Sequence, residues 1–121
     1  MKPANACQGR GIHIVDEIRD VNFNERSVIS KYITNPLLIN GHKFDLRIYV
    51  VVTGYEPLRV YVYQEGLARF ATESYSSKID KNNKFMHLTN YAINKKNKQF
   101  VENENAEEDD FGYKWSLGAF C

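Results

Sequence analysis

The chain has 121 residues, which is enough for one small domain and too few for two. It is 43% hydrophobic and 26% charged, and 16 basic against 15 acidic residues leave a formal charge of +1, so nothing general favours nucleic-acid binding. No apolar run is long enough to span a membrane, and no secretory signal precedes the polar N-terminal residues.

The two cysteines, Cys7 and Cys121, lie near opposite ends and form no C-x-x-C pair. A structural zinc site is therefore not expected, and a reduced, intracellular chain is the default expectation. The sequence opens without an element before Lys2 and stops within an apolar segment. We therefore expect residues 1–121 to be one incomplete domain of a longer protein.

The first third of the chain predicts a loop and two strands. Residues 3–11 are small, polar and glycine-bearing, which is typical of a loop. Residues 12–18 alternate in polarity and predict a strand, and residues 27–33 predict a second strand that ends before Pro36. Asn40-Gly41 follows a short apolar run and is a favoured hairpin dipeptide.

Residues 43–53 give the clearest strand, rich in β-branched and aromatic residues. One face carries Phe44, Leu46 and Ile48 and is expected in the core, whereas the other face begins with charged residues of mixed sign. After a turn at residues 54–57, residues 58–66 and 67–75 predict two further strands, and three strands joined by tight turns predict an antiparallel sheet.

The last third of the chain is less regular. Residues 76–84 predict a polar loop, and residues 85–93 fit a strand or a loop. Residues 95–110 are hydrophilic and end in an acidic run, which predicts a mobile acidic loop. Residues 113–120 predict the start of a helix, so that the chain as a whole is mostly β with little helix.

Several residues could bind an anion. Gly9 and Gly11 surround Arg10 before a predicted strand, which suits a phosphate loop or a plain turn. Lys2, just upstream, could reach such a phosphate or be solvated. Arg69 sits among apolar residues and therefore needs an anionic partner.

The charged face of the predicted strand 43–53 allows two interpretations. Lys43, Asp45 and Arg47 could form a row of surface ion pairs worth about 0–1 kcal/mol each. They could instead join an apolar wall to form a nucleotide pocket. Asp45 could pair with Arg69, and so could a substrate carboxylate or phosphate.

The segment from His87 to Tyr91 groups an imidazole, a hydroxyl and an amide, but no nucleophile with an adjacent base. Thr89 and Asn90 suit phosphate or amide contacts, or they cap a turn. These residues do not predict Ser/His/Asp chemistry.

Taken in order, five blocks resemble the tubulin tyrosine ligase-like family: "KPANACQGRGI", "SKYITNPLLINGHKFDLRIYVVVT", "PLRVYVYQEGLARFA", "HLTNYAINK" and "KWSL". The similarity runs from Lys2 to Leu117, and the tail most resembles the polyglutamylase branch. The resemblance implies an α+β ATP-grasp fold, here its central portion with mainly antiparallel sheet. It also implies an ATP-dependent ligase that adds glutamate to tubulin glutamate side chains through an acyl phosphate.

The resemblance also implies roles for individual residues. Arg47 and Arg69 would be catalytic and would hold the γ-phosphate and the acyl phosphate. ATP would contact Lys2, Gln8, Gly9, Arg10, Gly11, Ile12, Lys31, Tyr32, Ile33, Lys43, Asp45, Thr89 and Asn90.

The sequence departs from the family pattern at two positions, where Gln8 replaces a common arginine and Ser30 a common glutamine. The family's magnesium ligands lie beyond the position of Cys121, so they are expected outside this chain, which alone should be inactive. Implied partners are tubulin or microtubules, with their acidic C-terminal tails, and free glutamate, but no nucleic acid or membrane. The implied location is the cytoplasm and cytoskeleton, including a cilium or basal body.

Three alternatives stay open. One is a glycine or tyrosine ligase of the same fold. Another is a nucleotide- or tubulin-binding module without catalysis. The third is a small β domain that binds nucleic acid through Arg59, Tyr61 and Tyr63, which the near-zero net charge disfavours.

Overall fold

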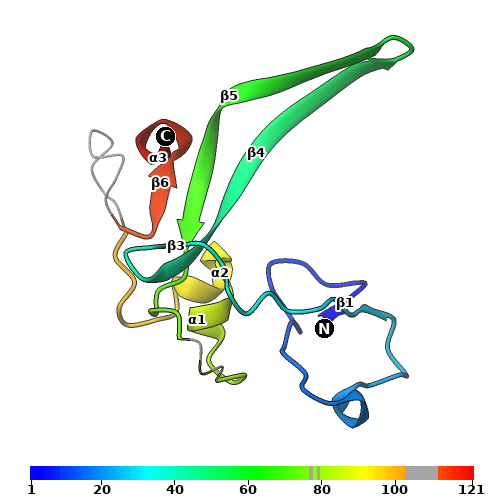
Figure 1. Ribbon diagram of the computed structural model, residues 1–121, viewed down its shortest axis with the longest axis vertical. Helices are drawn as coiled ribbons and strands as arrows, with labels where there is room; N and C mark the ends of the chain where they lie inside the picture. The colour runs from blue at the N-terminus through cyan, green and yellow to red at the C-terminus, as the bar shows by residue number, and fades with distance from the viewer. Residues whose placement is uncertain (77, 79, 103–111) are drawn as a thin grey trace.

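The computed structural model describes residues 1–76, 78, 80–102 and 112–121. Its strands form a two-stranded sheet of order β1–β2 and a four-stranded sheet of order β3–β4–β5–β6, in which every pairing is antiparallel (Figure 1). The expected α+β class, mainly antiparallel sheet with few short helices, is confirmed. In chain order the elements are β1 (Lys2–Pro3), η1 (Ile18–Asp20), β2 (Ser27–Val28), β3 (Leu38–Ile39), β4 (His42–Tyr55), β5 (Leu58–Phe70), α1 (Lys84–His87), α2 (Tyr91–Asn94), β6 (Lys114–Ser116) and α3 (Leu117–Phe120).

A tight turn joins β3 to β4. Asn40 and Gly41 have φ values of 50° and 78°, which is the left-handed conformation that the expected Asn-Gly hairpin turn requires. Leu38 then pairs with Lys43. The turn therefore fixes the register of β3 against β4, and Lys43 and Phe44 point to opposite faces because they are neighbours in the strand.

The long hairpin of β4 and β5 dominates the fold. The prediction of separate strands at residues 58–66 and 67–75 is wrong, because β5 runs without a turn from Leu58 to Phe70. Gly66 lies within this strand, where a Cβ would come to 2.6 Å from the carbonyl oxygen of Arg47. Between the pairs Ile48–Gly66 and Val50–Val62, one residue of β4 lies opposite three of β5. The glycine thus marks an irregularity in one strand.

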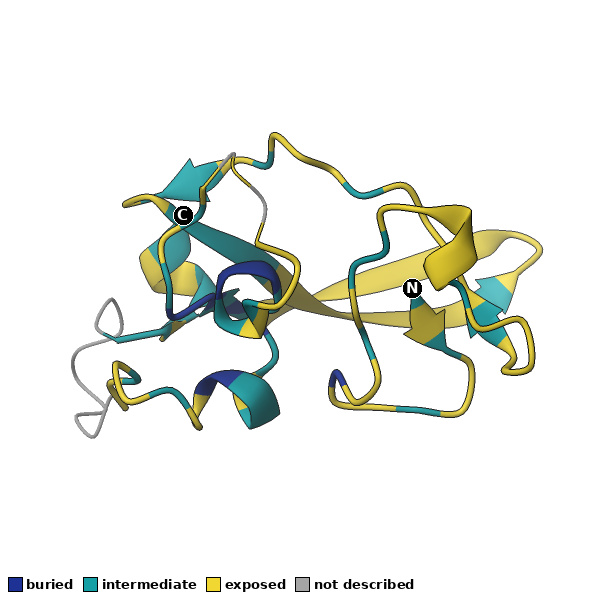
Figure 2. Ribbon diagram, turned by 90° about the horizontal axis from the view of Figure 1, so that it is seen from below, coloured by how far each residue is buried: buried dark blue, intermediate teal, exposed yellow. Residues whose placement is uncertain are grey.

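The buried core lies at the base of β5 and beside the short helices. Phe44 packs against Phe70 and Phe120, with ring centroids 5.9 and 5.2 Å apart. Leu46 and Ile48, expected beside Phe44 in the core, are 41% and 39% exposed. In Figure 2 the hairpin from Leu46 outward is almost entirely exposed until it returns toward Gly66. The fully or nearly fully buried side chains are Ala68, Phe70, Ala71, Thr72, Met86, His87, Thr89 and Asn94.

Two other strand predictions fail in the N-terminal part. Residues 12–17 form no strand, and β2 covers only Ser27–Val28 of the predicted strand 27–33. Met1 and His13 exchange two hydrogen bonds, at 2.8 and 3.2 Å, but the pairing does not extend beyond them. Residues 12–15 instead line a cavity, the polar His13 together with its apolar neighbours.

The C-terminal part is more helical than the sequence indicated. Residues 85–93, which fitted a strand or a loop, contribute to α1 and α2. The helix expected within residues 113–120 is present as α3, but β6 precedes it, and the Ser116 hydroxyl caps α3 by accepting from the Ala119 N–H at 3.0 Å. Half of the predicted mobile loop 95–110, residues 103–110, lies outside the described residues.

Candidate nucleotide-binding site

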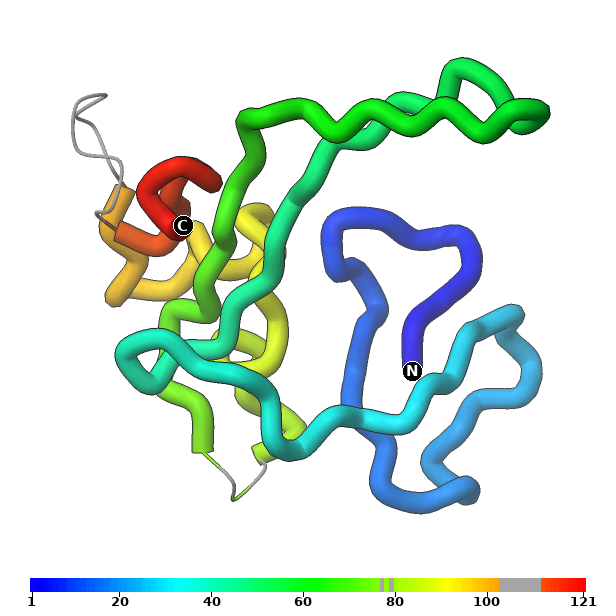
Figure 3. The backbone as a smooth tube through the Cα atoms, turned by 45° about the horizontal axis from the view of Figure 1, so that its top comes forward, coloured from blue at the N-terminus to red at the C-terminus, as the bar shows by residue number. Residues whose placement is uncertain are grey.

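A cavity of about 910 Å³ opens beside the base of β4. Its volume lies in the range of small-molecule sites, and segments distant in the sequence form its walls. Figure 3 shows the N-terminal segments lying alongside the β4–β5 hairpin on the side where these walls meet. Apolar walls come from Ile12, Ile14, Val15, Val28, Ile29, Ile33 and Leu37, and cations come from Lys2, Lys31, Lys43, Lys81 and Lys84.

Residues 31–33 form one wall of the cavity without belonging to a strand. Among the described residues, their backbone groups take part in no backbone–backbone hydrogen bond. Free N–H and C=O groups beside apolar side chains suit the edge and face of a flat heterocycle. Pro36 and the short β3 that follows prevent this segment from pairing as a longer strand.

Lys43 lies where the cavity meets the charged face of β4. Its ammonium donates to the Tyr32 hydroxyl at 3.4 Å and lies 4.8 Å from the centre of the Tyr32 ring. Burial lowers the pKa of Lys43, and the nearby Asp45 carboxylate opposes that effect. The cavity therefore holds a cation that is only partly hydrated.

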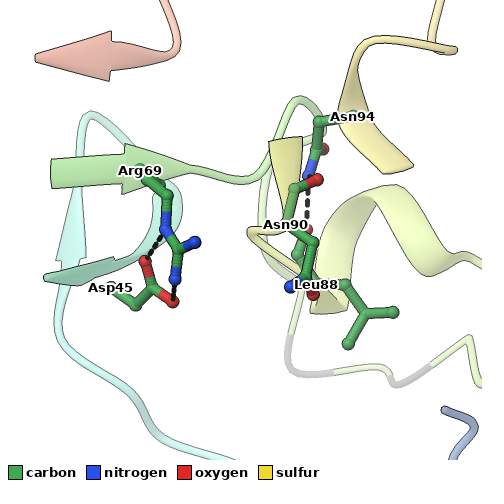
Figure 4. A network of polar contacts seen from close by, with 5 residues as sticks. All are labelled: Asp45, Arg69, Leu88, Asn90 and Asn94. Atoms are coloured by element: carbon green, nitrogen blue, oxygen red, sulfur yellow. Dashed lines mark hydrogen bonds and ion pairs between the residues drawn. The ribbon is translucent and has the colours of Figure 1, made fainter. Parts of the chain in front are cut away.

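Asp45 and Arg69 form a two-pronged ion pair across the hairpin (Figure 4). Arg69 Nε donates to Oδ1 at 2.7 Å and Nη2 donates to Oδ2 at 2.6 Å. These hydrogen bonds raise the pKa of Arg69. A guanidinium has five N–H donors, and Asp45 engages two of them, so three remain for an anion.

The strand register decides which charged residues share a face. Asp45 is paired with Arg69, and Arg47 follows two positions later on β4, opposite Leu67. Lys43 and all three of these residues therefore lie on one face of the sheet. Arg47 is exposed and forms no ion pair with a described residue. Neither arginine lines the large cavity, whereas Lys2 and Lys43 do.

The glycine loop packs against the start of α2. Gly9 is buried with a φ of 79°, and a Cβ there would lie 2.4 Å from Ile93 Cδ1 and 3.0 Å from Asn90 Oδ1. Only glycine allows this approach, which brings the loop beside Asn90. The neighbouring Gln8, Arg10 and Gly11 are exposed and do not line the large cavity, whereas Ile12 does.

Thr89 is buried and, with Arg69, lines a separate small hollow under β5. Asn90 precedes α2, and its carbonyl accepts from the Asn94 amide at 3.1 Å (Figure 4). The predicted site residues thus occupy one large cavity, the charged face of the sheet, and the loop against α2. They do not converge on a single concavity.

Among the described residues, no three His, Cys, Asp or Glu side chains gather in a way that could hold a metal ion. None of the described helices is long and apolar enough to cross a membrane.

Comparison with known proteins decides the family. The model of the tubulin-tyrosine ligase family matches residues 1–121, the whole chain. The chain belongs to the tubulin-tyrosine ligase family. The family expected from the sequence motifs is thereby confirmed.

Three related proteins are each named as a tubulin polyglutamylase or a probable one. The chain is 46% identical over 120 residues to the human tubulin polyglutamylase TTLL5 and 46% identical over 121 residues to the tubulin polyglutamylase ttll-5 of Caenorhabditis elegans. It is 48% identical over 120 residues to a probable beta-tubulin polyglutamylase of Tetrahymena thermophila. These alignments cover 97–98% of the chain and 9%, 17% and 10% of the respective relatives.

The sequence motifs did not predict several residues that line the large cavity. Lys81 and Lys84 line the cavity but belong to a stretch that the sequence indicated as a polar loop. His87 lines it as well, and its only signal was its place in the block "HLTNYAINK". The contacts of these side chains depend on segments far away in the sequence, so local patterns could not show them.

Proposed function

We propose that the protein uses ATP to add glutamate to glutamate side chains of tubulin. The observation that supports this most is the cavity itself. Apolar walls, a backbone segment outside any strand and five lysines meet beside a charged sheet face, in a chain that is 46–48% identical to tubulin polyglutamylases. An apolar region with cations at one side is what an adenine base and a polyphosphate require.

The cavity, the charged sheet face beside it and the glycine loop each have a role in this proposal. The adenine lies along residues 31–33, and Lys2 and Lys43 neutralise the phosphates. Asp45 fixes the orientation of Arg69, whose three remaining donors, together with Arg47, face the transferred phosphoryl group. Gly9 holds the glycine loop against Asn90, and the family resemblance assigns this loop, Thr89 and Asn90 to the same phosphates, although they lie outside the large cavity.

The reaction proceeds in two steps. A carboxylate oxygen of the tubulin glutamate takes the γ-phosphoryl group of ATP, and ADP leaves. The amine of free glutamate then attacks the carbonyl carbon of this acyl phosphate, phosphate leaves, and an isopeptide bond remains. Charge develops on the transferred group, so arginine and lysine accelerate the step by electrostatic stabilisation. Magnesium would be held by carboxylates from other parts of the protein. The microtubule cytoskeleton, including a cilium or basal body, is the proposed location.

Incorporation of radiolabelled glutamate into microtubules by the whole protein tests this function. Arg47→Ala is expected to reduce incorporation by about 10²-fold or more, because a donor to the transition state is lost. Arg59→Ala is the matched control, since Arg59 is an exposed arginine near the far end of the same hairpin, and should stay within about twofold. Incorporation of glycine or tyrosine instead of glutamate, or full activity of Arg47→Ala, would overturn the proposal.

A further inference from the structure

A buried histidine stands in the cavity wall without a role in the proposed reaction. His87 closes α1 and is only 4% exposed. Its Nε2 lies 2.9 Å from the carbonyl oxygen of Asp80. A carbonyl oxygen can only accept, so Nε2 carries a proton and donates it.

The other ring nitrogen of His87 faces Tyr32. Nδ1 lies 2.7 Å from the Tyr32 hydroxyl oxygen, and the two rings stand almost perpendicular at a centroid distance of 5.4 Å. Burial, with the nearby Tyr75 hydroxyl, raises the pKa of Tyr32, so its hydroxyl keeps its proton. In the tautomer whose single proton is on Nε2, His87 has a lone pair on Nδ1 that accepts a hydrogen bond from the Tyr32 hydroxyl.

The Tyr32 hydroxyl oxygen in turn accepts from Lys43. Once the hydroxyl proton points to His87, its lone pairs face the Lys43 ammonium at 3.4 Å. Every donor then meets an acceptor along one direction: Lys43 to Tyr32, Tyr32 to His87, and His87 to the Asp80 carbonyl. Such aligned bonds polarise one another and favour one arrangement over its alternatives.

We propose that His87 is a positioning residue that holds the Lys43 ammonium toward bound phosphates by way of the Tyr32 hydroxyl. This inference rests on the proposed function, because it assigns Lys43 to the phosphates of ATP. This series of hydrogen bonds also joins three segments far apart in the sequence: the cavity wall at residues 31–33, the base of β4, and α1 with the loop before it. If His87 only filled the core, its loss would not change the affinity for ATP relative to the affinity for adenosine.

Removal of the hydroxyl alone tests the role of the chain in binding. In the whole protein, Tyr32→Phe should weaken ATP binding about threefold to tenfold, the worth of one net hydrogen bond, and change adenosine binding less than twofold. Tyr55→Phe is the matched control, because Tyr55 is 84% exposed at the tip of the hairpin. Equal loss of ATP and adenosine affinity in Tyr32→Phe would overturn the proposal.

Variants of the histidine provide the second arm. His87→Phe keeps a ring of similar size but neither nitrogen, and should weaken ATP binding as much as Tyr32→Phe does. His87→Asn offers an oxygen near the place of Nδ1 and should restore part of the affinity. Failure of His87→Asn to bind ATP better than His87→Phe would count against a hydrogen-bonded role.

A double-mutant cycle without nucleotide separates this inference from the proposed function. If Tyr32 and His87 act through one hydrogen bond, the Tm of the double variant should fall no further than that of the less stable single variant. Additive losses of Tm would show that Tyr32 and His87 do not act through one hydrogen bond, even if ATP binds well. A wild-type protein that binds no ATP would overturn the proposed function, and a non-additive cycle would then still support the hydrogen-bonded chain.

Discussion

Asp45 and Arg69 hold each other by two parallel hydrogen bonds of 2.7 and 2.6 Å across β4 and β5. The ion pair is partly exposed, since the Arg69 side chain is 22% exposed and that of Asp45 is 41% exposed. Directly beneath it, Phe44 and Phe70 are paired on the opposite face. Two successive residue pairs of β4 and β5 therefore place the charged face directly over the core.

This pairing predicts a moderate loss of stability when only the charge is removed. Asp45→Asn keeps the size of the side chain but leaves Arg69 without its anionic partner, and should lower the free energy of unfolding by about 1 kcal/mol. Urea unfolding measures the change. Glu17→Gln, which removes the exposed ion pair with Arg19, is the control and should change stability by less than about 0.5 kcal/mol. Equal effects of the two variants would show that the paired geometry adds nothing.

The glycine loop gives a prediction that separates backbone strain from crowding. Gly9 and Gly41 have nearly equal φ values of 79° and 78°, but a Cβ meets nothing within 4 Å at Gly41. Gly41→Ala should therefore cost about 1–2 kcal/mol from the left-handed conformation alone. Gly9→Ala should cost about 1–3 kcal/mol more, because its Cβ also collides with Ile93. Urea unfolding compares the two variants.

Replacement of the crowding partner checks the cause. Ile93→Ala removes the Cδ1 atom that would lie 2.4 Å from a Cβ at Gly9, and it should reduce the extra cost of Gly9→Ala but not the strain. If Gly9→Ala costs no more than Gly41→Ala, the loop does not pack on α2 in solution.

Strand β4 and the turn before it could be predicted from local sequence because their signals are local. The Asn40-Gly41 turn and the β-branched residues of β4 depend only on neighbouring positions and gave the correct strand and turn. Gly66 misled for the opposite reason. Gly66 allows the backbone of β5 to lie close to Arg47 on β4, but a glycine between two apolar runs has the same local pattern as a turn between two strands.

The cavity could not be built from local patterns. Lys2 and Lys43 line the same space, but they are 41 positions apart, and only the family resemblance suggested a common ligand. Alternation at Ile12 and Ile14 has the period of a strand, yet these residues line the cavity and pair with no strand. The contact of His87 with Tyr32 spans 55 positions, which no short-range rule detects.

Asn94 is expected to be the most sensitive polar residue of the described core. Its amide oxygen accepts from the Thr72 N–H and hydroxyl, both at 2.9 Å, and its amide nitrogen donates to the carbonyls of Leu88 and Asn90. Asn94→Asp keeps the shape but turns two carbonyls toward a second oxygen, so the free energy of unfolding should fall by about 3 kcal/mol. Asn24→Asp at an exposed position is the control, expected within about 0.5 kcal/mol in the same urea unfolding. A small effect at Asn94 would mean that the two carbonyls find other donors.

The partly buried ammonium of Lys43, which the proposed function assigns to the phosphates of ATP, should reduce the stability of the free protein. Burial holds its pKa below the ordinary lysine value in the folded state, whereas unfolding returns it to about 10.4. Between these two values the unfolded chain binds more protons, so stability rises with pH through that window, and the full penalty is present below it.

Lys43→Met should therefore stabilise the protein at pH 7, by less than about 1 kcal/mol because the ammonium stays partly exposed. This gain should shrink as the pH rises toward 10.4, and the variant should bind ATP more weakly than wild type. Lys98→Met, at an exposed position, should show neither change when thermal unfolding is followed from pH 7 to pH 10.5. A destabilised Lys43→Met variant at pH 7 would show that the contact with Tyr32 outweighs the burial of the charge.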